Sequence, residues 1–503
     1  MPQTEPIQGR FPLALAVDIG SSSVRAVVFD ADARQLMHTE HRERYRLEIT
    51  ADGGSMCDPH RIRRLVAKCV RKSCEALGEH VADVAVVGIS CHWHSLMGLN
   101  RQGSPVTPVY MWSDKRSSAD ADDLARELDA ASVHQRTGCR LHSSYWPAKL
   151  RWLQRTRANA AGGVSTWCGL ADWFVLADGQ PITTSISSAS ATGMLTTNTQ
   201  RWDLQLLAHL KLANAELPRI VDRTTAIPIE AVHPDLIPPG LNATWYPAIG
   251  DGAAANIGAS AVGDDRIALT IGTSGAIRLV RSLSTDTRLP PSLFRYLVDA
   301  ETEVIGGALS NGGNMMSWLS GVTGEKDHKS AMAASARIAP DSHGLTVLPF
   351  FAGERAPSWQ DAVGGTITGM TLDTSPSHLH RALLEATALR FASVYDSVSL
   401  FAANQHDIMA NGGALLQAPL WMQITADALG HRISALHSRM EASARGAAIA
   451  ALQGAKVIPD IRTEINVRQR YVPDASATAV YRKARARQDA LERALSQWEQ
   501  EIS

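Results

Sequence analysis

The chain reads Ala16-Val17-Asp18-Ile19-Gly20-Ser21-Ser22-Ser23 near its start, and a close copy, Ala268-Leu269-Thr270-Ile271-Gly272-Thr273-Ser274-Gly275, stands near its middle. In each copy an apolar run typical of a buried strand ends in glycine and hydroxyl residues, and a second apolar run follows (24–29 and 276–280). The pattern predicts a hairpin with an exposed polar tip, repeated once in each half of the chain. Two copies of one loop indicate two related halves.

The tips of both hairpins suit an anion such as a phosphate oxygen, because small residues let backbone N–H groups approach a ligand closely. The copies differ at one position, where Asp18 in the first corresponds to Thr270 in the second. A carboxylate on one side only is expected if that side holds a metal ion and the other side holds only phosphate. A single Gly-Ser/Thr-rich hairpin is often just a turn, and neither tip is a Walker loop. The duplication favours a nucleotide site between two domains.

Composition limits the class of protein. A chain of 503 residues predicts two domains of about 200 to 250 residues each. A formal net charge of -1, from 49 basic and 50 acidic residues, gives no broad attraction to nucleic acid or to an anionic membrane. The 6 cysteines lack zinc-type spacing and are interpreted as reduced thiols. With no signal peptide or membrane span apparent, we expect a soluble cytoplasmic protein with a small-molecule partner.

Periodicity predicts an α/β architecture. A helical pattern at 60–77 precedes a strand-like apolar run at 84–89. Prolines cluster at 226–247 and interrupt regular structure, so the crossover between domains is expected there. Further helices are expected at 120–128, 149–153, 314–319, 378–401, 419–429 and 479–498.

Six short motifs occur along nearly the whole chain. They are Asp18-Ile-Gly-Ser-Ser-Ser-Val-Arg25, Trp112-Ser-Asp114-Lys-Arg116, Ile249-Gly-Asp251-Gly-Ala-Ala-Ala-Asn256, Ile271-Gly-Thr-Ser-Gly-Ala-Ile-Arg278, Gly353-Glu-Arg-Ala-Pro357 and Asn411-Gly-Gly-Ala414. In this order they resemble the FGGY carbohydrate kinases, a branch of the actin-like ATPases. The resemblance implies an α/β fold with two actin-like (ribonuclease H-like) ATPase domains flanking a central cleft, a sugar-binding domain at 1–245 and an ATP-binding domain at 246–503. It also implies ATP and Mg²⁺ as cofactors.

Other stretches resemble the gluconate kinases within that family. These are Thr137-Gly138 followed by His142 and Lys149, Ser188-Ala-Ser-Ala-Thr-Gly193 followed by Trp202-Asp203, Asn311-Gly-Gly313 and His94-Ser95-Leu96. The residues before His94 and after His142 depart from that pattern. The resemblance implies phosphorylation of gluconate to 6-phosphogluconate, with xylulose or another pentulose or polyol as the alternative substrate. An actin-like ATP-binding module without kinase activity is the alternative from another class.

Two aspartates carry the expected chemistry. Asp251 lies in a Gly-Asp-Gly turn, and the resemblance favours it as the general base for a sugar hydroxyl. Its alternative is a cap for a helix beginning near Ala253. Asp18 is expected to bind Mg²⁺ directly or through water, and its alternative is an aspartate of a turn.

The tips and the resemblance together indicate the remaining contacts. Arg25 is expected to bind phosphate, and its alternative is a surface ion pair. His92 suits a structural role as well as it suits substrate contact, and a metal-binding His92–His94 pair lacks a third ligand. For a sugar acid, His92, His94, His142 or Lys149 would supply a donor to the carboxylate. A homodimer is compatible with the sequence. Phosphate and nucleotide contacts are expected from Ser21, Ser22, Ser23, Arg25, Gly272, Thr273, Ser274, Gly313, Ser317, Gly413, Ala414 and Gln417, and sugar contacts from His94, Trp112, Asp114 and His142.

Overall fold

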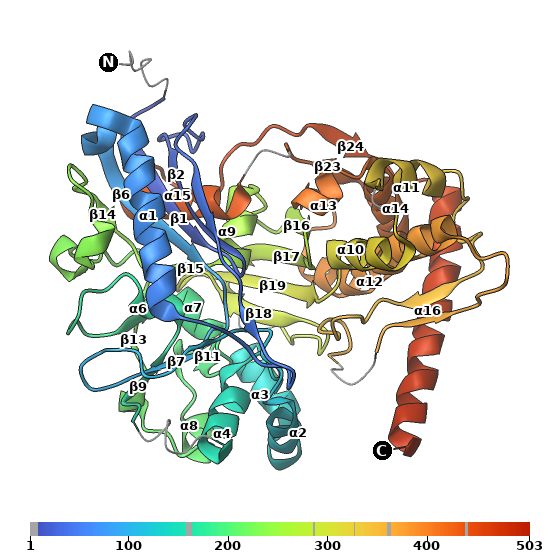
Figure 1. Ribbon diagram of the computed structural model, residues 1–503, viewed down its shortest axis with the longest axis horizontal. Helices are drawn as coiled ribbons and strands as arrows, with labels where there is room; N and C mark the ends of the chain where they lie inside the picture. The colour runs from blue at the N-terminus through green and yellow to red at the C-terminus, as the bar shows by residue number, and fades with distance from the viewer. Residues whose placement is uncertain are drawn as a thin grey trace.

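The computed structural model of the chain describes residues 9–156, 163–284, 287–325, 327–359, 364–437 and 441–502. Two lobes are visible, each built on its own sheet, with the first lobe in blue and green and most of the second in yellow to red (Figure 1). Sheets with helices packed against them in both halves are the α/β architecture that the sequence predicts.

The first lobe is built on a mixed sheet with strand order β14-β6-β1-β2-β3, and β15 also pairs with β6. Ile19 pairs with Val24, and the N–H of Gly20 donates to the carbonyl of Ser23 at 3.0 Å, which forms the predicted first hairpin. Both faces of β1 are buried, as its unbroken apolar run requires. The strands are β1 Leu13–Ile19, β2 Ser23–Phe29, β3 His41–Arg44, β6 Val84–Cys91, β14 Thr244–Trp245 and β15 Ile249–Gly250.

The second lobe repeats the plan, with strand order β18-β19-β17-β16-β22-β23-β24. Ile271 pairs with Gly275, and the N–H of Gly272 donates to the carbonyl of Ser274 at 2.9 Å, which forms the second hairpin. Helix α12 (Pro376–Val398) lies against β17 and β19. The strands are β16 Arg266–Ile271, β17 Gly275–Ser282, β18 Phe294–Leu297, β19 Thr302–Leu309, β22 Asp407–Asn411, β23 Ile433–Ala435 and β24 Gln469–Tyr471.

Helix α9 (Asp251–Gly258) leads from the first sheet to the second, and α15 (Ala442–Gly454) returns from the second half to cover the first sheet opposite α1 (Pro59–Leu77) (Figure 1). The two crossing helices touch through their backbones. A Cβ on Gly446 would lie 1.8 Å from the carbonyl oxygen of Ala254, so only glycine fits there. The helix that begins with Asp251 is therefore held by a segment from the other end of the chain.

The sequence predicts that the crossover between domains lies in the proline-rich segment 226–247. The structure shows that it lies after this segment. Trp245 and Gly250 pair with Val87 and Cys91 of β6, so the chain leaves the first sheet only at Gly250. The prolines instead shape the edge of the first lobe. The domain boundary between residues 245 and 246 stays a prediction.

The expected helices are found at 59–77, 118–127, 313–323, 376–398, 419–429 and 475–502, and 149–153 lies inside α4. No helix of the described ranges is both long and apolar enough to cross a bilayer. The remaining elements of the first lobe are β4 Glu48–Ile49, β5 Ser55–Cys57, η1 Gly78–Asp83, β7 Met97–Leu99, β8 Val109–Tyr110, α2 Ser118–Glu127, α3 Ala130–Thr137, α4 Trp146–Thr156, β9 Thr166–Cys168, α6 Leu170–Trp173, β10 Thr183–Ser185, α7 Ile186–Ser190, β11 Leu195–Thr196, β12 Arg201–Trp202, α8 Leu204–His209, η2 Asn214–Glu216, β13 Arg219–Val221, η3 Ile229–Ala231 and η4 Pro234–Leu236. Those of the second lobe are α10 Gly313–Thr323, α11 His328–Ser335, β20 Thr346–Leu348, β21 Thr366–Thr368, η5 Ser399–Phe401, α13 Gly413–Leu416, α14 Pro419–Leu429 and α16 Ala475–Ile502.

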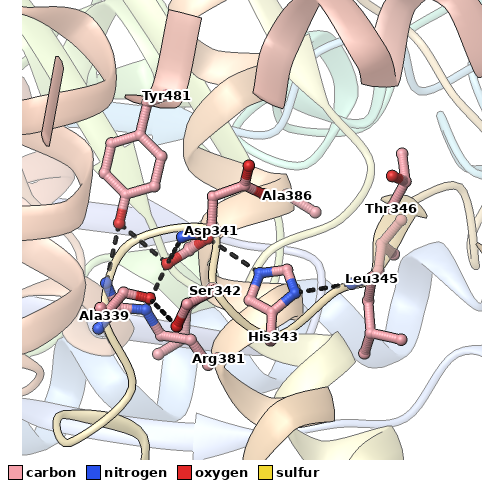
Figure 2. A network of polar contacts seen from close by, with 12 residues as sticks. Ala339, Asp341, Ser342, His343, Leu345, Thr346, Arg381, Ala386 and Tyr481 are labelled. Carbon is pink, nitrogen blue, oxygen red and sulfur yellow. Dashed lines mark hydrogen bonds and ion pairs between the residues drawn. The ribbon is translucent and has the colours of Figure 1, made fainter. Parts of the chain in front are cut away.

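A buried ionic network anchors the C-terminal helix α16 to α12. Glu385 accepts hydrogen bonds from Arg381, from the hydroxyl of Tyr481 at 2.9 Å and from Nε2 of His343 at 3.0 Å, and these three side chains converge in Figure 2. Burial raises the pKa of Glu385, but the His343 hydrogen bond and the Arg381 charge outweigh burial and hold it below its usual value.

The same network brings Asp341, His343 and Glu385 within 4.8 Å of one another, a spacing that would suit a metal ion. The hydrogen bonds argue against one. Nδ1 of His343 accepts from the N–H of Leu345 at 3.0 Å, which places the ring proton on Nε2, facing Glu385. The cluster therefore has a structural role and holds α16 against α12.

Candidate functional site

A cavity of about 170 Å³ lies between the lobes, where the two hairpin tips approach each other. Larger grooves of about 1050 and 1410 Å³ lie on the surface and include no residue of either tip. The small cavity is lined by polar and aromatic side chains from both lobes. Its polar lining includes Ser21, His94, Asp251, Thr270, Ser274, Arg278 and Arg355, and its aromatic lining includes Trp93, Trp112, Tyr145, Phe294, Tyr296 and Trp359.

Asp251 lines this cavity from the first turn of α9. Its Oδ1 accepts a hydrogen bond from the N–H of Gly252 at 2.8 Å, and the backbone of Trp93 also donates to the carboxylate. Burial raises the pKa of Asp251, while the positive charge of Arg278 opposes the rise. The helix cap is Gly250 and not Asp251. A buried carboxylate with a raised pKa is well suited to accept a proton.

Asp18 lies near Asp251 because β1 and β15 both pair with β6, which places Asp18 opposite Ser90 and Gly250 opposite Cys91. Burial raises the pKa of Asp18, the charge of Arg25 lowers it, and the negative charge of Asp251 raises it again. A divalent cation between the two carboxylates would relieve their repulsion. Mg²⁺ takes one or two carboxylates and keeps several waters, so the donors present fit the ion. Asp18 stays the predicted metal residue.

Arg25 faces carboxylates and not the cavity. Its Nε lies 3.3 Å from Oδ2 of Asp18, and its Nη1 pairs with Glu441, which also binds Arg42 at 2.7 Å. The structure thus shows the ion-pair alternative, although Arg25 is largely buried and not on the surface. Since Glu441 directly precedes α15, the pair ties the first tip to the second half. A role in phosphate binding stays a prediction and requires this pair to open.

The three serines of the first tip point to different places. Ser21 lines the cavity. Ser22 is exposed, and its carbonyl accepts from the N–H of Tyr45 at 3.0 Å. Ser23 is buried as the first residue of β2. Ser21 is therefore the serine of this tip that a ligand in the cavity would meet.

The predicted nucleotide residues of the second lobe come together. The carbonyls of Gly272 and Thr273 accept from the N–H groups of Gly313 and Asn314 at 2.8 and 3.1 Å, so α10 begins directly on the second tip. A Cβ on Gly313 would lie 3.1 Å from Cβ of Ala414. Small residues here leave room for a ligand against the backbone, as phosphate and nucleotide sites require.

Gly412, which precedes two of these residues, has φ 93°, and a Cβ there would lie 2.5 Å from the carbonyl oxygen of Ile271. The left-handed turn therefore needs glycine, and it directs Gly413 and Ala414 toward the second tip. Gln417 directly follows α13, and Ser317 is exposed one turn into α10. Their contacts with a nucleotide stay predictions.

His94 lines the cavity as a neutral ring. Its Nδ1 lies 2.6 Å from the carbonyl oxygen of Ala191, so the ring proton is on Nδ1 and Nε2 is an acceptor. Burial lowers its pKa to about 3. The expectation that His94 donates to a carboxylate is therefore not met in this tautomer. His94 is instead suited to accept a hydrogen bond from a sugar hydroxyl.

Of the other predicted sugar residues, Trp112 lines the cavity and Asp114 does not. The guanidinium of Arg355 lies 4.6 Å from the Trp112 ring centroid, as in a cation–π contact. Asp114 is buried and forms a two-bond ion pair with Arg116, at 3.0 and 2.5 Å, and accepts from the N–H of Ser55 at 3.1 Å. Both carboxylate oxygens are thus occupied, which supports the loop that carries Trp112.

The remaining predicted donors lie behind the cavity wall. Nδ1 of His142 accepts from the N–H of Ser144 at 3.1 Å, and Lys149 donates to the carbonyl of Ser143. His92 follows the end of β6, its Nδ1 lies 3.3 Å from the carbonyl oxygen of Ile19, and burial lowers its pKa to about 4. None of the three lines the cavity in the described structure.

Two arginines that the sequence reasoning missed line the cavity. Arg278 lies within the apolar strand β17, and its Nε is buried without a hydrogen-bond partner among the described residues. Burial lowers its pKa, and the charge of Asp251 opposes this. The sequence does hold a signal for Arg278, because a charged residue inside an apolar strand is expected to be buried and a buried charge needs a partner. Arg355 belongs to the Gly353-Glu-Arg-Ala-Pro357 motif, for which the sequence alone predicts no role.

Two paired tyrosines, also not predicted, complete this wall of the cavity. The hydroxyls of Tyr145 and Tyr296 lie 2.7 Å apart, and one donates to the other. The Tyr145 ring lies 5.0 Å from the ring of His94. These rings form the apolar wall that a sugar site needs.

Comparison with known proteins gives matches across both lobes. The model for the FGGY family of carbohydrate kinases, N-terminal domain, matches residues 13–236, and that for the C-terminal domain matches residues 267–455. A gluconokinase of Bacillus subtilis (strain 168) is 26% identical over 454 residues, covering 87% of this chain and 86% of the relative. A glycerol kinase of Rhodospirillum centenum (strain ATCC 51521 / SW) is 30% identical over 445 residues, covering 84% and 85%.

Solved structures share the whole architecture. A gluconate kinase from Lactobacillus acidophilus superimposes with a TM-score of 0.88 at 23% identity, covering 98% of this chain and 99% of that one. A ligand-bound xylulose kinase from the same organism gives the same TM-score and identity, covering 98% and 100%. The predicted fold of two domains flanking a cleft is confirmed.

Proposed function

The chain belongs to the FGGY family of carbohydrate kinases, and from this premise we propose that it transfers the γ-phosphoryl group of ATP to gluconate, giving 6-phosphogluconate. The family makes it a phosphotransferase with an alcohol acceptor that uses ATP and a small-molecule sugar substrate. A non-catalytic ATP-binding module is thereby set aside. The relatives include gluconokinases, glycerol kinases and xylulose kinases, so the choice of substrate rests on the cavity.

The charge of the cavity carries the proposal. Two guanidinium groups, Arg278 and Arg355, line it against one carboxylate, Asp251, among the described lining residues. An uncharged polyol would leave the buried Nε of Arg278 without a partner, at a cost in desolvation. The carboxylate of a sugar acid would satisfy it, because arginine binds carboxylates through paired N–H groups.

Each residue then has a role in transfer. Asp251 takes the proton of the sugar hydroxyl as that oxygen attacks the γ-phosphorus. His94 accepts a hydrogen bond from another hydroxyl, and Trp112 and the two tyrosines form the apolar wall. Asp18 would hold Mg²⁺, which when bound supplies charge neutralisation on the phosphate oxygens.

The second tip and the start of α10 are proposed to bind the phosphates of ATP through backbone N–H groups and hydroxyls. Gly413, Ala414, Ser317 and Gln417 would contact the nucleoside. In this proposal the sugar binds mainly against the first lobe and the nucleotide mainly against the second, with Asp251 between them.

The test compares specificity constants for gluconate, xylulose, glycerol and sorbitol, the last being an uncharged six-carbon polyol. The proposal predicts that gluconate exceeds the other three by at least tenfold in kcat/KM, about 1.4 kcal/mol in transition-state binding. A tenfold preference for xylulose or glycerol would refute the gluconate assignment and leave the kinase activity standing.

A further inference from the structure

The segment 350–359, named the strap here, follows β20 and brings second-lobe residues to the sugar cavity. Arg355 and Trp359 both line that cavity. The strap is fixed on its own lobe by the N–H of Ala356, which donates to the carbonyl of Ala308 at 3.0 Å, and by Arg355, whose Nη2 donates to the carbonyl of Leu309 at 3.3 Å.

The strap also reaches the first lobe. Lys115 donates to the carbonyl of Ala352 at 3.2 Å, Arg355 lies over the Trp112 ring, and the ring of Trp359 lies 5.4 Å from that of His142. These contacts exist only while the lobes are close together. The strap therefore distinguishes a closed cleft from an open one.

Asn311 joins the strap to the nucleotide end of the site. Its Nδ2 donates to the carbonyl of Gly353 at 2.9 Å, and its Oδ1 accepts from the N–H of Ala352 at 3.0 Å. The side chain is buried, with 4% of the residue exposed. Two residues later Gly313 donates to the carbonyl of Gly272 on the second tip. One side chain thus connects the turn that begins α10 to the strap that carries Arg355.

We propose that Asn311 is a positioning residue that couples nucleotide binding to sugar binding. The inference rests on the proposed function for the location of the two ligands. A nucleotide at the second tip fixes the turn 311–313, the two amide hydrogen bonds fix Ala352 and Gly353, and the strap is then held with Arg355 and Trp359 against the first lobe. Each ligand favours the same closed arrangement, so each must tighten the binding of the other by the same factor.

Calorimetry on the full chain tests this. The dissociation constant of a non-hydrolysable ATP analogue is measured with and without saturating gluconate, and separately with xylulose. In the wild type the sugar that binds should tighten the analogue by about fivefold or more, a usual size for coupling between sites. In Asn311→Ala that ratio should fall below about twofold, whereas the affinity for the analogue alone should change less.

Asn314→Ala is the matched control. Asn314 stands in the same turn, accepts from the N–H of Gly312 at 2.8 Å and makes no hydrogen bond to the strap in the described residues. It should keep the wild-type ratio even if nucleotide affinity falls. Asn311→Asp keeps the acceptor for Ala352 but loses the donor to Gly353, and it decides the question if Asn311→Ala does not fold.

The proposal is overturned if the wild-type ratio is one, if the folded Asn311 variant keeps the full ratio, or if Asn314→Ala loses as much. Failure of the proposed function looks different. If xylulose binds and gluconate does not, the gluconate assignment is wrong, and the ratio measured with xylulose still tests Asn311.

Discussion

Replacing Arg278 by methionine should separate substrate charge from protein stability. The guanidinium lines the cavity, its Nε is buried with no hydrogen-bond partner among the residues that the structure describes, and burial lowers its pKa. If it binds the gluconate carboxylate, the variant loses a charge-assisted hydrogen bond worth about 1.5–3 kcal/mol. Since about 1.4 kcal/mol is a factor of ten, kcat/KM for gluconate should fall roughly 10- to 150-fold, and that for sorbitol much less.

Stability should change little, because methionine removes one buried charge and fills similar space but also removes the cation that stabilises ionised Asp251. The acid limb of the pH–rate profile should also shift upward. Asp251 must be deprotonated to act. Burial raises its pKa, and in the wild type the charge of Arg278 opposes that rise, so the pKa of Asp251 should be higher in the variant. Steady-state kinetics from pH 4 to 8 and thermal unfolding measure both effects. Equal losses on gluconate and sorbitol, or an unfolded variant, would refute the reasoning.

Three further changes test other parts of the account. Asp251→Asn should lower kcat by about 10²- to 10⁴-fold, the usual contribution of a general base. Its affinity for an ATP analogue, measured by calorimetry, should stay within a few-fold of the wild type. A variant that keeps half the wild-type rate would show that Asp251 is not the general base. Asp18→Ala should raise the Mg²⁺ concentration needed for half-maximal rate, and an unchanged Mg²⁺ dependence would remove the metal assignment. Glu385→Gln should lower the melting temperature at pH 7, because the pKa of Glu385 is held below its usual value. That difference should shrink as the pH falls through the lowered pKa, and a difference that does not shrink across an acidic pH series would contradict it.

The sequence predicts both hairpins because their features are local, whereas the nucleotide residues of the second lobe came largely from the family resemblance and stay predictions. A strand, a glycine and hydroxyl residues within a few positions determine each tip. The pairing of Thr270 with Asn411 is seen only in the structure, where β16 and β22 lie side by side. Asp251 was predicted from its Gly-Asp-Gly turn together with the family resemblance, and its role as general base stays a prediction.

The rest depended on contacts between distant segments. Glu441 forms an ion pair with Arg25 of the first tip, and position 446 must be glycine because the carbonyl of Ala254 lies against it. The carbonyl of Ala191 determines the tautomer of His94, and nothing near His94 in the sequence shows this. Arg278 was the avoidable omission, since a charge inside an apolar strand calls for a partner.

Product analysis tests the central claim most directly. Purified protein, ATP, Mg²⁺ and gluconate are followed by ³¹P NMR, with Asp251→Asn as the matched control. We predict equal amounts of 6-phosphogluconate and ADP from the wild type and almost none from the variant. ATP consumption that is independent of gluconate, or a phosphorylated product from xylulose or glycerol but not from gluconate, would contradict the account.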